Sequence, residues 1–272
     1  MWLNESFATF VGKHIAHSTH LRLGDSEKFE HMHCFITDTK LGAQSLDSKV
    51  SSHPVQSKVT KISQFDSIFD AISYNKGGML LYQLHTLIGH ETWCKGIRQY
   101  LEKFKHSNAE NLDLWQCLSE VSGKDILSLM NYWISTTGFP CVKISLDEKY
   151  ENILLEQDIY LSEKKSDQKC DKIWPIPFAM SYRTKSGKAV DFETIFNSKS
   201  LSIKISPEDP IESIKINPDC RSFFVYCLSK PLCDIAVKNF SYLHKTEKTD
   251  FFNNICPLVI FNSLAFEIKY YI

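Results

Sequence analysis

Residues 69–81, Phe-Asp-Ala-Ile-Ser-Tyr-Asn-Lys-Gly-Gly-Met-Leu-Leu, decide how the first half of this chain folds. Apolar residues recur at a spacing of three and four on both sides of the polar centre, which predicts helices with one buried face. They are Phe65, Ile68, Phe69 and Ile72 before it, and Leu80, Leu81, Leu84, Leu87 and Ile88 after it. Each glycine inside a helix costs about 1 kcal/mol relative to alanine. Gly77 and Gly78 therefore indicate either a helix break or a backbone that closely approaches another element.

Tyr74 stands next to these glycines, where both neighbouring segments would hold it rigidly. From the residues alone, a core tyrosine at a helix junction is the simpler interpretation. The surrounding residues, however, resemble the Ser-Tyr-x-Lys-Gly segment of the zinc aminopeptidases that include membrane alanyl aminopeptidase and puromycin-sensitive aminopeptidase. In that family the tyrosine donates a hydrogen bond to the oxyanion of the tetrahedral intermediate. The resemblance implies this role for Tyr74, and a preorganised phenol suits it physically.

A second motif stands at the start of the chain. Residues 2–9, Trp-Leu-Asn-Glu-Ser-Phe-Ala-Thr, resemble the family segment Trp-Leu-Asn-Glu-Gly-Phe-Ala, whose glutamate is the third zinc ligand. The resemblance implies that Glu5 is a metal ligand, with Ser6 in place of the glycine. The two histidine ligands of the family's His-Glu-x-x-His motif, and its Gly-x-Met-x-Asn loop, would lie before Met1. Because a catalytic zinc needs three protein ligands, we expect one Zn²⁺ with an incomplete ligand set in this chain.

Other histidines offer a different metal site. His14, His17 and His20 recur at every third residue. A helix rotates by about 100° per residue, so the outer two lie about 240° apart around its axis. We therefore expect solvated histidines on an exposed face. Residues 90–94, His-Glu-Thr-Trp-Cys, begin like His-Glu-x-x-His, but Cys94 replaces the second histidine, and we interpret this segment as a structural helix start.

The apolar periodicity also predicts the order of elements. Helices are expected at residues 1–24, 80–89, 91–104, 111–123 and 125–136, whereas residues 35–57 look polar and irregular. Within the latter, His53 is expected to be a cleft-side or structural residue. After the turn signal at residues 137–140, alternating patterns predict strands, followed by a helix after residue 228. The strands are expected at residues 142–146, 153–157, 176–180, 201–205, 214–216 and 223–226.

These patterns predict an α + β multidomain protein. By resemblance, residues 1–138 would be the helical C-terminal half of a thermolysin-like catalytic domain. Residues 139–228 would form a small β-sandwich. Residues 229–272 would begin a helical domain that the chain does not complete.

Composition narrows the class of protein. The chain has 272 residues, a formal net charge of −1 and 43% hydrophobic residues, which is typical of a globular protein. This charge gives no reason to expect nucleic acid or a membrane as a partner. Nine cysteines without a Cys-x-x-Cys pair predict reduced thiols in the cytoplasm. We also expect no signal peptide and no membrane span.

Three hypotheses follow for the function. The first is a fragment of a cytoplasmic zinc metalloaminopeptidase, which removes N-terminal residues from peptides with a free N-terminus and needs the missing N-terminal half of the enzyme as a partner. The second is a catalytically inactive remnant or interaction module. The third is an unrelated metal-binding protein that uses His14, His17 and His20. We expect the isolated chain to be inactive and poorly soluble, because Trp2, Phe7 and Phe10 would lack packing partners.

Overall fold

The computed structural model describes residues 2–23, 31–57, 69–162 and 171–261. The chain forms two compact units. The first contains residues 1–139, together with the short segments 161–163 and 221–223. The second contains residues 140–160, 164–220 and 224–272. Phe65 and Ile68, which were assigned to a buried helix face, lie outside the described residues.

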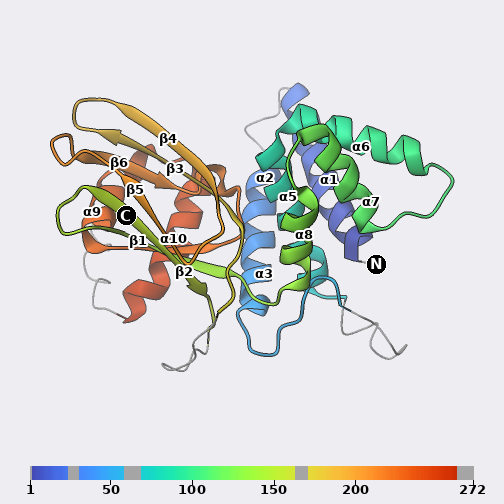
Figure 1. Cartoon of the computed structure of the whole chain (residues 1–272), viewed down its shortest axis with the longest axis horizontal. Helices are drawn as coiled ribbons and strands as arrows, with labels where there is room; N and C mark the ends of the chain where they lie inside the picture. Colours follow the sequence, from blue (N-terminus) through green and yellow to red (C-terminus); the bar gives the residue numbers. More distant parts are fainter. Residues whose placement is uncertain (1, 24–30, 58–68, 163–170, 262–272) are drawn as a thin grey trace. The chain divides into compact units, whose positions relative to one another are not determined.

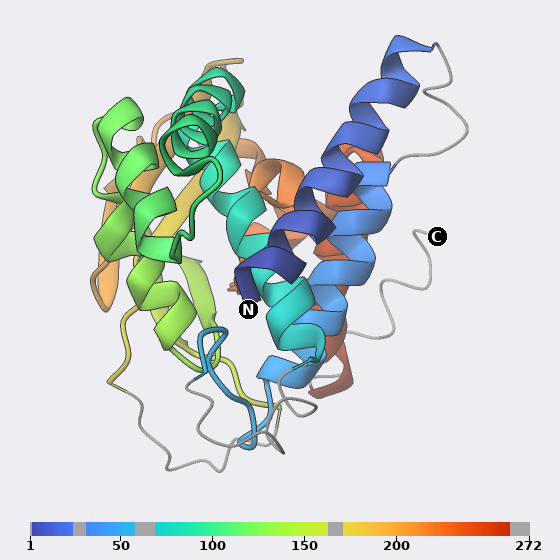
Figure 2. The same ribbon diagram turned by 90° about the vertical axis from the view of Figure 1, so that its right-hand side faces the viewer.

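The first unit is helical (Figures 1 and 2). Its elements are α1 (Trp2–Arg22), α2 (His31–Cys34), the π-helical turn η1 (Phe35–Thr39), α3 (Lys40–Asp47), the π-helical turn η3 (Ile72–Lys76), α5 (Gly77–Ile88), α6 (His90–Phe104), α7 (Asn111–Ser122) and α8 (Ile126–Ser135). The helices predicted around α1, α5, α6, α7 and α8 are therefore confirmed. Gly123, with φ of 67°, ends α7, and the Asp125 carboxylate accepts the Ser128 N–H at 3.0 Å to start α8.

Two local predictions for this unit were wrong. Residues 35–47 are helical rather than irregular. The sequence pattern did not indicate this helix, because α3 buries polar side chains and therefore shows no apolar stripe. Lys40, Gln44 and Asp47 are all buried on this helix. Phe69 is 44% exposed and lies in a bend, so it does not continue the buried face to which Ile72 belongs.

The apolar side of α1 has packing partners within the unit. The ring of Trp2 stacks on Trp115, with 6.2 Å between centroids. Phe10 is fully buried, and its ring lies 6.1 Å from Phe35 and 5.6 Å from Trp93. The ring of Phe7 also stacks on Trp93, with 6.4 Å between centroids. The expectation that Trp2, Phe7 and Phe10 would lack packing partners is therefore wrong.

A buried ion pair joins three segments of the first unit. Lys76 Nζ lies 2.8 Å from Asp47 Oδ2, and both side chains are 0% exposed. Lys76 also donates to the carbonyl oxygens of Thr136 and Gly138, at 3.1 and 3.0 Å. Asp47 Oδ1 accepts the N–H of Gly138 at 2.9 Å and the hydroxyl of Ser52 at 2.7 Å. The end of α3, the end of η3 and the segment after α8 thus share one polar centre.

Among the residues that the structure describes, the second unit contains two sheets and two α-helices, and Figure 1 shows their arrangement within the unit. Its strands are β1 (Pro140–Leu146), β2 (Asn152–Ile159), β3 (Ile176–Thr184), β4 (Ala189–Phe196), β5 (Ser200–Lys204), β6 (Ile211–Ile216) and β7 (Val225–Leu228). One sheet has the order β5-β2-β1-β7, and the other has the order β4-β3-β6. All pairs are antiparallel except β1 with β7. All six predicted strands are present, although β7 begins at Val225 rather than at residue 223.

Strand β4 is an additional element. It lies at the edge of its sheet and alternates exposed and half-buried residues. Val190, Phe192 and Phe196 alternate with Asp191 and Glu193, and this period of two was the available signal for a strand.

Gln157 is a polar residue on the inward face of β2, and its side chain is fully buried. Its amide Nε2 donates to the carbonyl oxygens of Trp174, Phe196 and Ser198, at 3.1, 3.4 and 2.9 Å. Its Oε1 accepts the N–H of Trp174 at 2.8 Å. Because Phe196 ends β4, this side chain connects the two sheets.

The helices of the second unit are α9 (Lys230–Lys238) and α10 (Lys245–Phe261). The predicted amphipathic helix is confirmed as α9, which contacts β1 and β6, and α10 contacts β7. The division of the chain into three domains at residues 138 and 228 stays a prediction. Within the described ranges, no helix is both long enough and apolar enough to cross a bilayer.

We predict that Lys76→Met lowers the free energy of unfolding by about 3–5 kcal/mol, because Asp47 would remain buried without its cation. Denaturant unfolding followed by circular dichroism measures this loss. Lys105→Met is the matched control, because Lys105 forms an exposed pair with Glu102 and its removal should change stability little. Equal stability of the two variants would contradict the structural importance of the buried pair.

Candidate functional site

Tyr74 lies in η3, the π-helical turn that leads directly into α5. π-Helical turns within helices are rare and occur frequently at functional sites. The backbone N–H of Tyr74 donates to the carbonyl of Asp70 at 3.1 Å, and its ring lies 6.3 Å from that of Phe69. The residue is partly exposed.

The structure brings Tyr74 and Glu5 together. Glu5 lies near the start of α1. Burial, followed by hydrogen bonding to Glu5 and the negative charge of that residue, raises the pKa of Tyr74 above its ordinary value of 10.0. Tyr74 is therefore protonated at neutral pH, as a tyrosine of ordinary pKa also is, and its hydroxyl can donate a hydrogen bond.

Close packing of α1 against η3 and α5 fixes this pair. The buried Ser6 hydroxyl donates to the carbonyl of Ser73 at 2.6 Å. A Cβ atom on Gly77 would lie 1.9 Å from Ser6 Oγ, so only glycine fits without displacement. Figure 2 shows α1 crossing α5. Gly77 and Gly78 are the first two residues of α5 and lie within a continuous helical segment. Gly77 therefore marks a close approach of α1, and the alternative of a helix break is wrong.

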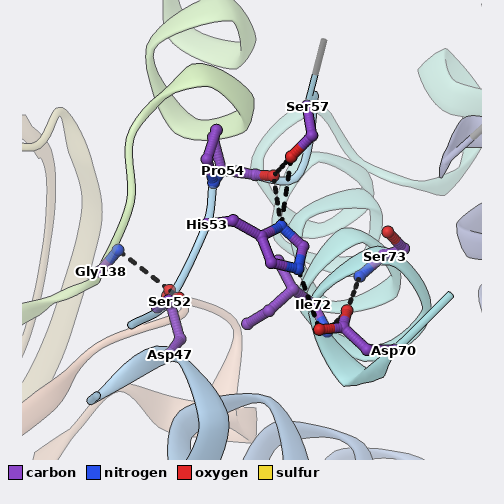
Figure 3. A network of polar contacts seen from close by, with 9 residues as sticks. All are labelled: Asp47, Ser52, His53, Pro54, Ser57, Asp70, Ile72, Ser73 and Gly138. Atoms are coloured by element: carbon purple, nitrogen blue, oxygen red, sulfur yellow. Dashed lines mark hydrogen bonds and ion pairs between the residues drawn. The ribbon is translucent and has the colours of Figure 1, made fainter. Parts of the chain in front are cut away.

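Asp70 and His53 support the start of η3 (Figure 3). Asp70 Oδ1 accepts the backbone N–H groups of Ile72 and Ser73, at 2.8 and 3.2 Å. Its other oxygen, Oδ2, lies 2.9 Å from His53 Nε2. His53 Nδ1 lies 2.9 Å from the carbonyl oxygen of Pro54. His53 thus positions Asp70, and Asp70 caps the turn that carries Tyr74.

No role was predicted for Asp70, although the sequence carried a signal for one. An aspartate immediately before a helical segment is a common N-terminal cap, because its carboxylate accepts the N–H groups two and three positions further on. The role of His53 as a structural residue agrees with its contacts. Whether it lies beside a substrate cleft stays a prediction.

A second group of side chains forms at the other end of α1. The alternative metal site of His14, His17 and His20 is not among the groups of possible ligands in the described residues. Instead, His14 lies with His85 and His90, with ring nitrogens within 4.8 Å of one another. Burial and the two neighbouring histidines lower the pKa of His85 to about 4. Burial, His90 and His17 also lower the pKa of His14, which is partly buried rather than solvated as expected.

A zinc site at Glu5 requires further ligands. In the part of the chain that the structure describes, Glu5 belongs to no group of three or more His, Cys, Asp or Glu side chains that could share one ion. A catalytic zinc takes three protein ligands and one open position. The described residues therefore do not fit a zinc ion at Glu5 by themselves, and no zinc-dependent step follows from them.

Comparisons with known proteins agree with the sequence motifs. Residues 1–133 match the family described as the Peptidase family M1 domain. The chain is 37% identical over 226 residues to Aminopeptidase 2, mitochondrial, of Saccharomyces cerevisiae. It is 30% identical over 261 residues to Tricorn protease-interacting factor F2 of Thermoplasma acidophilum, and 32% identical over 224 residues to Leucyl aminopeptidase of Saccharolobus solfataricus. These alignments cover 83, 96 and 82% of the chain.

The same alignments cover 22, 30 and 26% of the three relatives. The chain therefore spans less than a third of the length of these curated relatives.

We predict that Gly77→Ala lowers the free energy of unfolding by roughly 1–3 kcal/mol, because the added Cβ displaces Ser6. Gly78→Ala is the matched control, since its Cβ would meet Thr9 at an ordinary contact distance of 3.5 Å. The double variant Ser6→Gly with Gly77→Ala should recover most of the loss. Thermal and denaturant unfolding measure all three variants, and equal stability of the two single variants would contradict the packing.

We predict that the pKa of Tyr74 lies above 10.0 and falls toward that value in Glu5→Gln, because the negative charge that opposes its ionisation is removed. The tyrosinate absorbance of the wild type minus that of Tyr74→Phe isolates this group. Circular dichroism at each pH checks that the chain remains folded. The same difference between the wild type and Tyr242→Phe gives the titration of Tyr242, which is 80% exposed and serves as the reference tyrosine. An unchanged titration in Glu5→Gln would contradict the contact.

Proposed function

Residues 1–133 belong to peptidase family M1, and from this membership we propose that the chain is part of a zinc metalloaminopeptidase. It would contribute the helical C-terminal part of a thermolysin-like catalytic domain and the β-sandwich that follows. The complete enzyme would remove N-terminal residues from peptides with a free N-terminus. The aminopeptidase names of the yeast and archaeal relatives support this activity.

The observation that carries the proposal is the packing of α1 against η3, which brings Glu5 close enough to Tyr74 to raise the pKa of its hydroxyl. These two residues belong to separate motifs, one in α1 and one in η3. In the family, these motif positions supply the third zinc ligand and the oxyanion donor. Their proximity in this fold supports the same two roles for Glu5 and Tyr74.

The remaining residues of the site position Tyr74. Asp70 caps η3, and Ser6 with Gly77 holds α1 against the same turn. The backbone that carries this donor is thus held in place, and the single phenolic proton turns from Glu5 to the substrate oxygen as negative charge develops there. Tyr74 is protonated at neutral pH, as a tyrosine of ordinary pKa also is, so its hydroxyl can donate this hydrogen bond.

The zinc ion would need ligands from outside this chain. The sequence contains no His-Glu-x-x-His motif, so Glu5 would be completed by an N-terminal half in a longer polypeptide or in a second chain. When bound, the ion would supply an activated water and polarise the peptide carbonyl.

The absent motif also favours a second candidate, an inactive remnant or interaction module of the same family. The two candidates differ in one measurable property. The first requires that Glu5 and Tyr74 work when the missing half is supplied, whereas the second does not.

A chimera tests this difference. In yeast Aminopeptidase 2, the segment that aligns with this chain would be replaced by this chain, and hydrolysis of an aminoacyl chromogenic substrate would be measured. We expect zinc-dependent activity, and a decrease in kcat of about 10²–10³-fold in Tyr74→Phe with zinc content unchanged. Glu5→Gln should lose zinc. Tyr150→Phe, at a 52% exposed position, is the control and should keep full activity.

Three outcomes would count against the proposal. An inactive but folded chimera would favour the remnant. Full activity of Tyr74→Phe would exclude the proposed role of this residue. Zinc-dependent hydrolysis by the 272-residue chain alone would show that its site is complete without further ligands.

We propose a cytoplasmic location on separate grounds. The seven cysteines whose side chains the structure describes are free thiols, including Cys141 and Cys227, whose sulfur atoms lie 3.6 Å apart. Free thiols at such a distance are typical of a reducing compartment. Recovery of the native protein in a secreted or organellar fraction would contradict this location.

A further inference from the structure

Three histidines from different helices meet in the first unit, away from Glu5. His14 lies on α1, His85 on the last turn of α5 and His90 at the start of α6. Their ring centroids are 4.9 Å apart for His14 and His85, and 5.4 Å apart for the other two pairs. His14 follows Glu5 by nine residues of one helix, which is about 13 Å along the axis. The two sites therefore cannot share one ion.

The connection between α5 and α6 creates this group. Gly89 has φ of 80° and ψ of 154°, a conformation that favours glycine, and it is the single residue between the two helices. The sharp turn places His85 and His90 side by side, with 3.2 Å between His85 Nε2 and His90 Nδ1. Phe10 and Trp93 pack against the His85 ring, with centroids 5.6 and 5.8 Å away. The group is thus held by the apolar core on one side.

The spacing of the nitrogen atoms suits a metal ion. With Zn–N bonds of about 2.0–2.1 Å, two ligands of a tetrahedral zinc lie about 3.4 Å apart. The distance from His85 Nε2 to His90 Nδ1 is close to this value. The ligand nitrogens of all three histidines lie within 4.8 Å of one another, so the three rings would have to move closer together by only a small amount to bind one ion. His85 Nδ1 is buried and has no hydrogen-bond partner among the described residues.

The chemistry of the donors narrows the choice of ion. Imidazole nitrogen suits zinc and its first-row neighbours, whereas magnesium and calcium prefer oxygen ligands. Cys94 lies one turn after His90 on α6, and its Sγ is 3.6 Å from His90 Nε2, so a sulfur atom also stands beside the group. The exposed position of His90 leaves one side open to solvent, as a fourth ligand requires.

We propose that His14, His85 and His90 form a site for a divalent transition-metal ion of the zinc class, distinct from the proposed catalytic position at Glu5. The bound ion joins α1, α5 and α6 at one point and acts as a structural link. This inference does not depend on the aminopeptidase activity. It concerns only residues that the chain itself supplies.

Zinc binding to the complete 272-residue chain tests the proposal. The purified chain is freed of metal with a chelator and titrated with Zn²⁺ in competition with a chromophoric indicator. Co²⁺ is used in parallel, because a tetrahedral site with histidine ligands gives strong visible absorption. His90→Ala is the principal variant, since this exposed side chain can be removed without disturbing the core, and His85→Gln is the second.

Two controls separate this site from other binding. His17→Ala removes a histidine of the same helix that lies outside the group, and Glu5→Gln removes the proposed catalytic ligand. We expect one Zn²⁺ per chain, at least about 100-fold weaker binding in both His90→Ala and His85→Gln, and unchanged binding in both controls. The Co²⁺ absorption should disappear in His90→Ala while its circular dichroism remains that of the wild type.

Absence of stoichiometric Zn²⁺ binding would overturn the proposal. So would Zn²⁺ binding that is unaffected by His90→Ala, or that is lost in Glu5→Gln alone. Loss of Zn²⁺ binding in Glu5→Gln alone would assign the ion to the catalytic position. Failure of this inference can therefore be distinguished from failure of the proposed function.

Discussion

The ion pair between Lys76 and Asp47 is the interaction on which the first unit depends. Both side chains are fully buried, and their remaining hydrogen bonds go to backbone groups near Gly138 and to Ser52. Loss of either partner would leave a charge in the protein interior, which is strongly destabilising. The pair therefore requires α3, η3 and the segment after α8 to assemble together. Lys76 also ends the π-helical turn that holds Tyr74, so the polar core and the candidate site share one short segment.

The candidate site is built by packing rather than by a rigid loop. Ser6 and Gly77 determine how closely α1 approaches η3, and this approach brings Glu5 within reach of Tyr74. Asp70 fixes the same turn from its other end. Positions without any polar function, such as Gly77, are thus as necessary for the contact as the two residues that make it.

The sequence was informative where one physical rule acted alone. The apolar stripe of α7 and the alternation of β1 predicted these elements, and the two motifs selected Glu5 and Tyr74 before their contact was known. Prediction failed where burial involved polar groups. Helix α3 buries Lys40 and Asp47, so its pattern resembled a loop. The histidine group was missed because His14 joins residues far along the chain through the turn at Gly89, and helical spacing on α1 alone cannot indicate such partners.

Gln157 has a consequence for how the strands of the second unit find their alignment. Its amide occupies an inward-facing position of β2 among apolar neighbours and satisfies backbone groups near the ends of both sheets. A slip of β2 by one residue would turn the opposite face inward and place the carboxylate of Glu156 or Asp158 at this point. Neither carboxylate can donate hydrogen bonds to the carbonyl oxygens of Trp174 and Phe196, and each would bring a negative charge against them. One buried amide thus penalises a one-residue slip of this strand and favours the correct register as the sheets form.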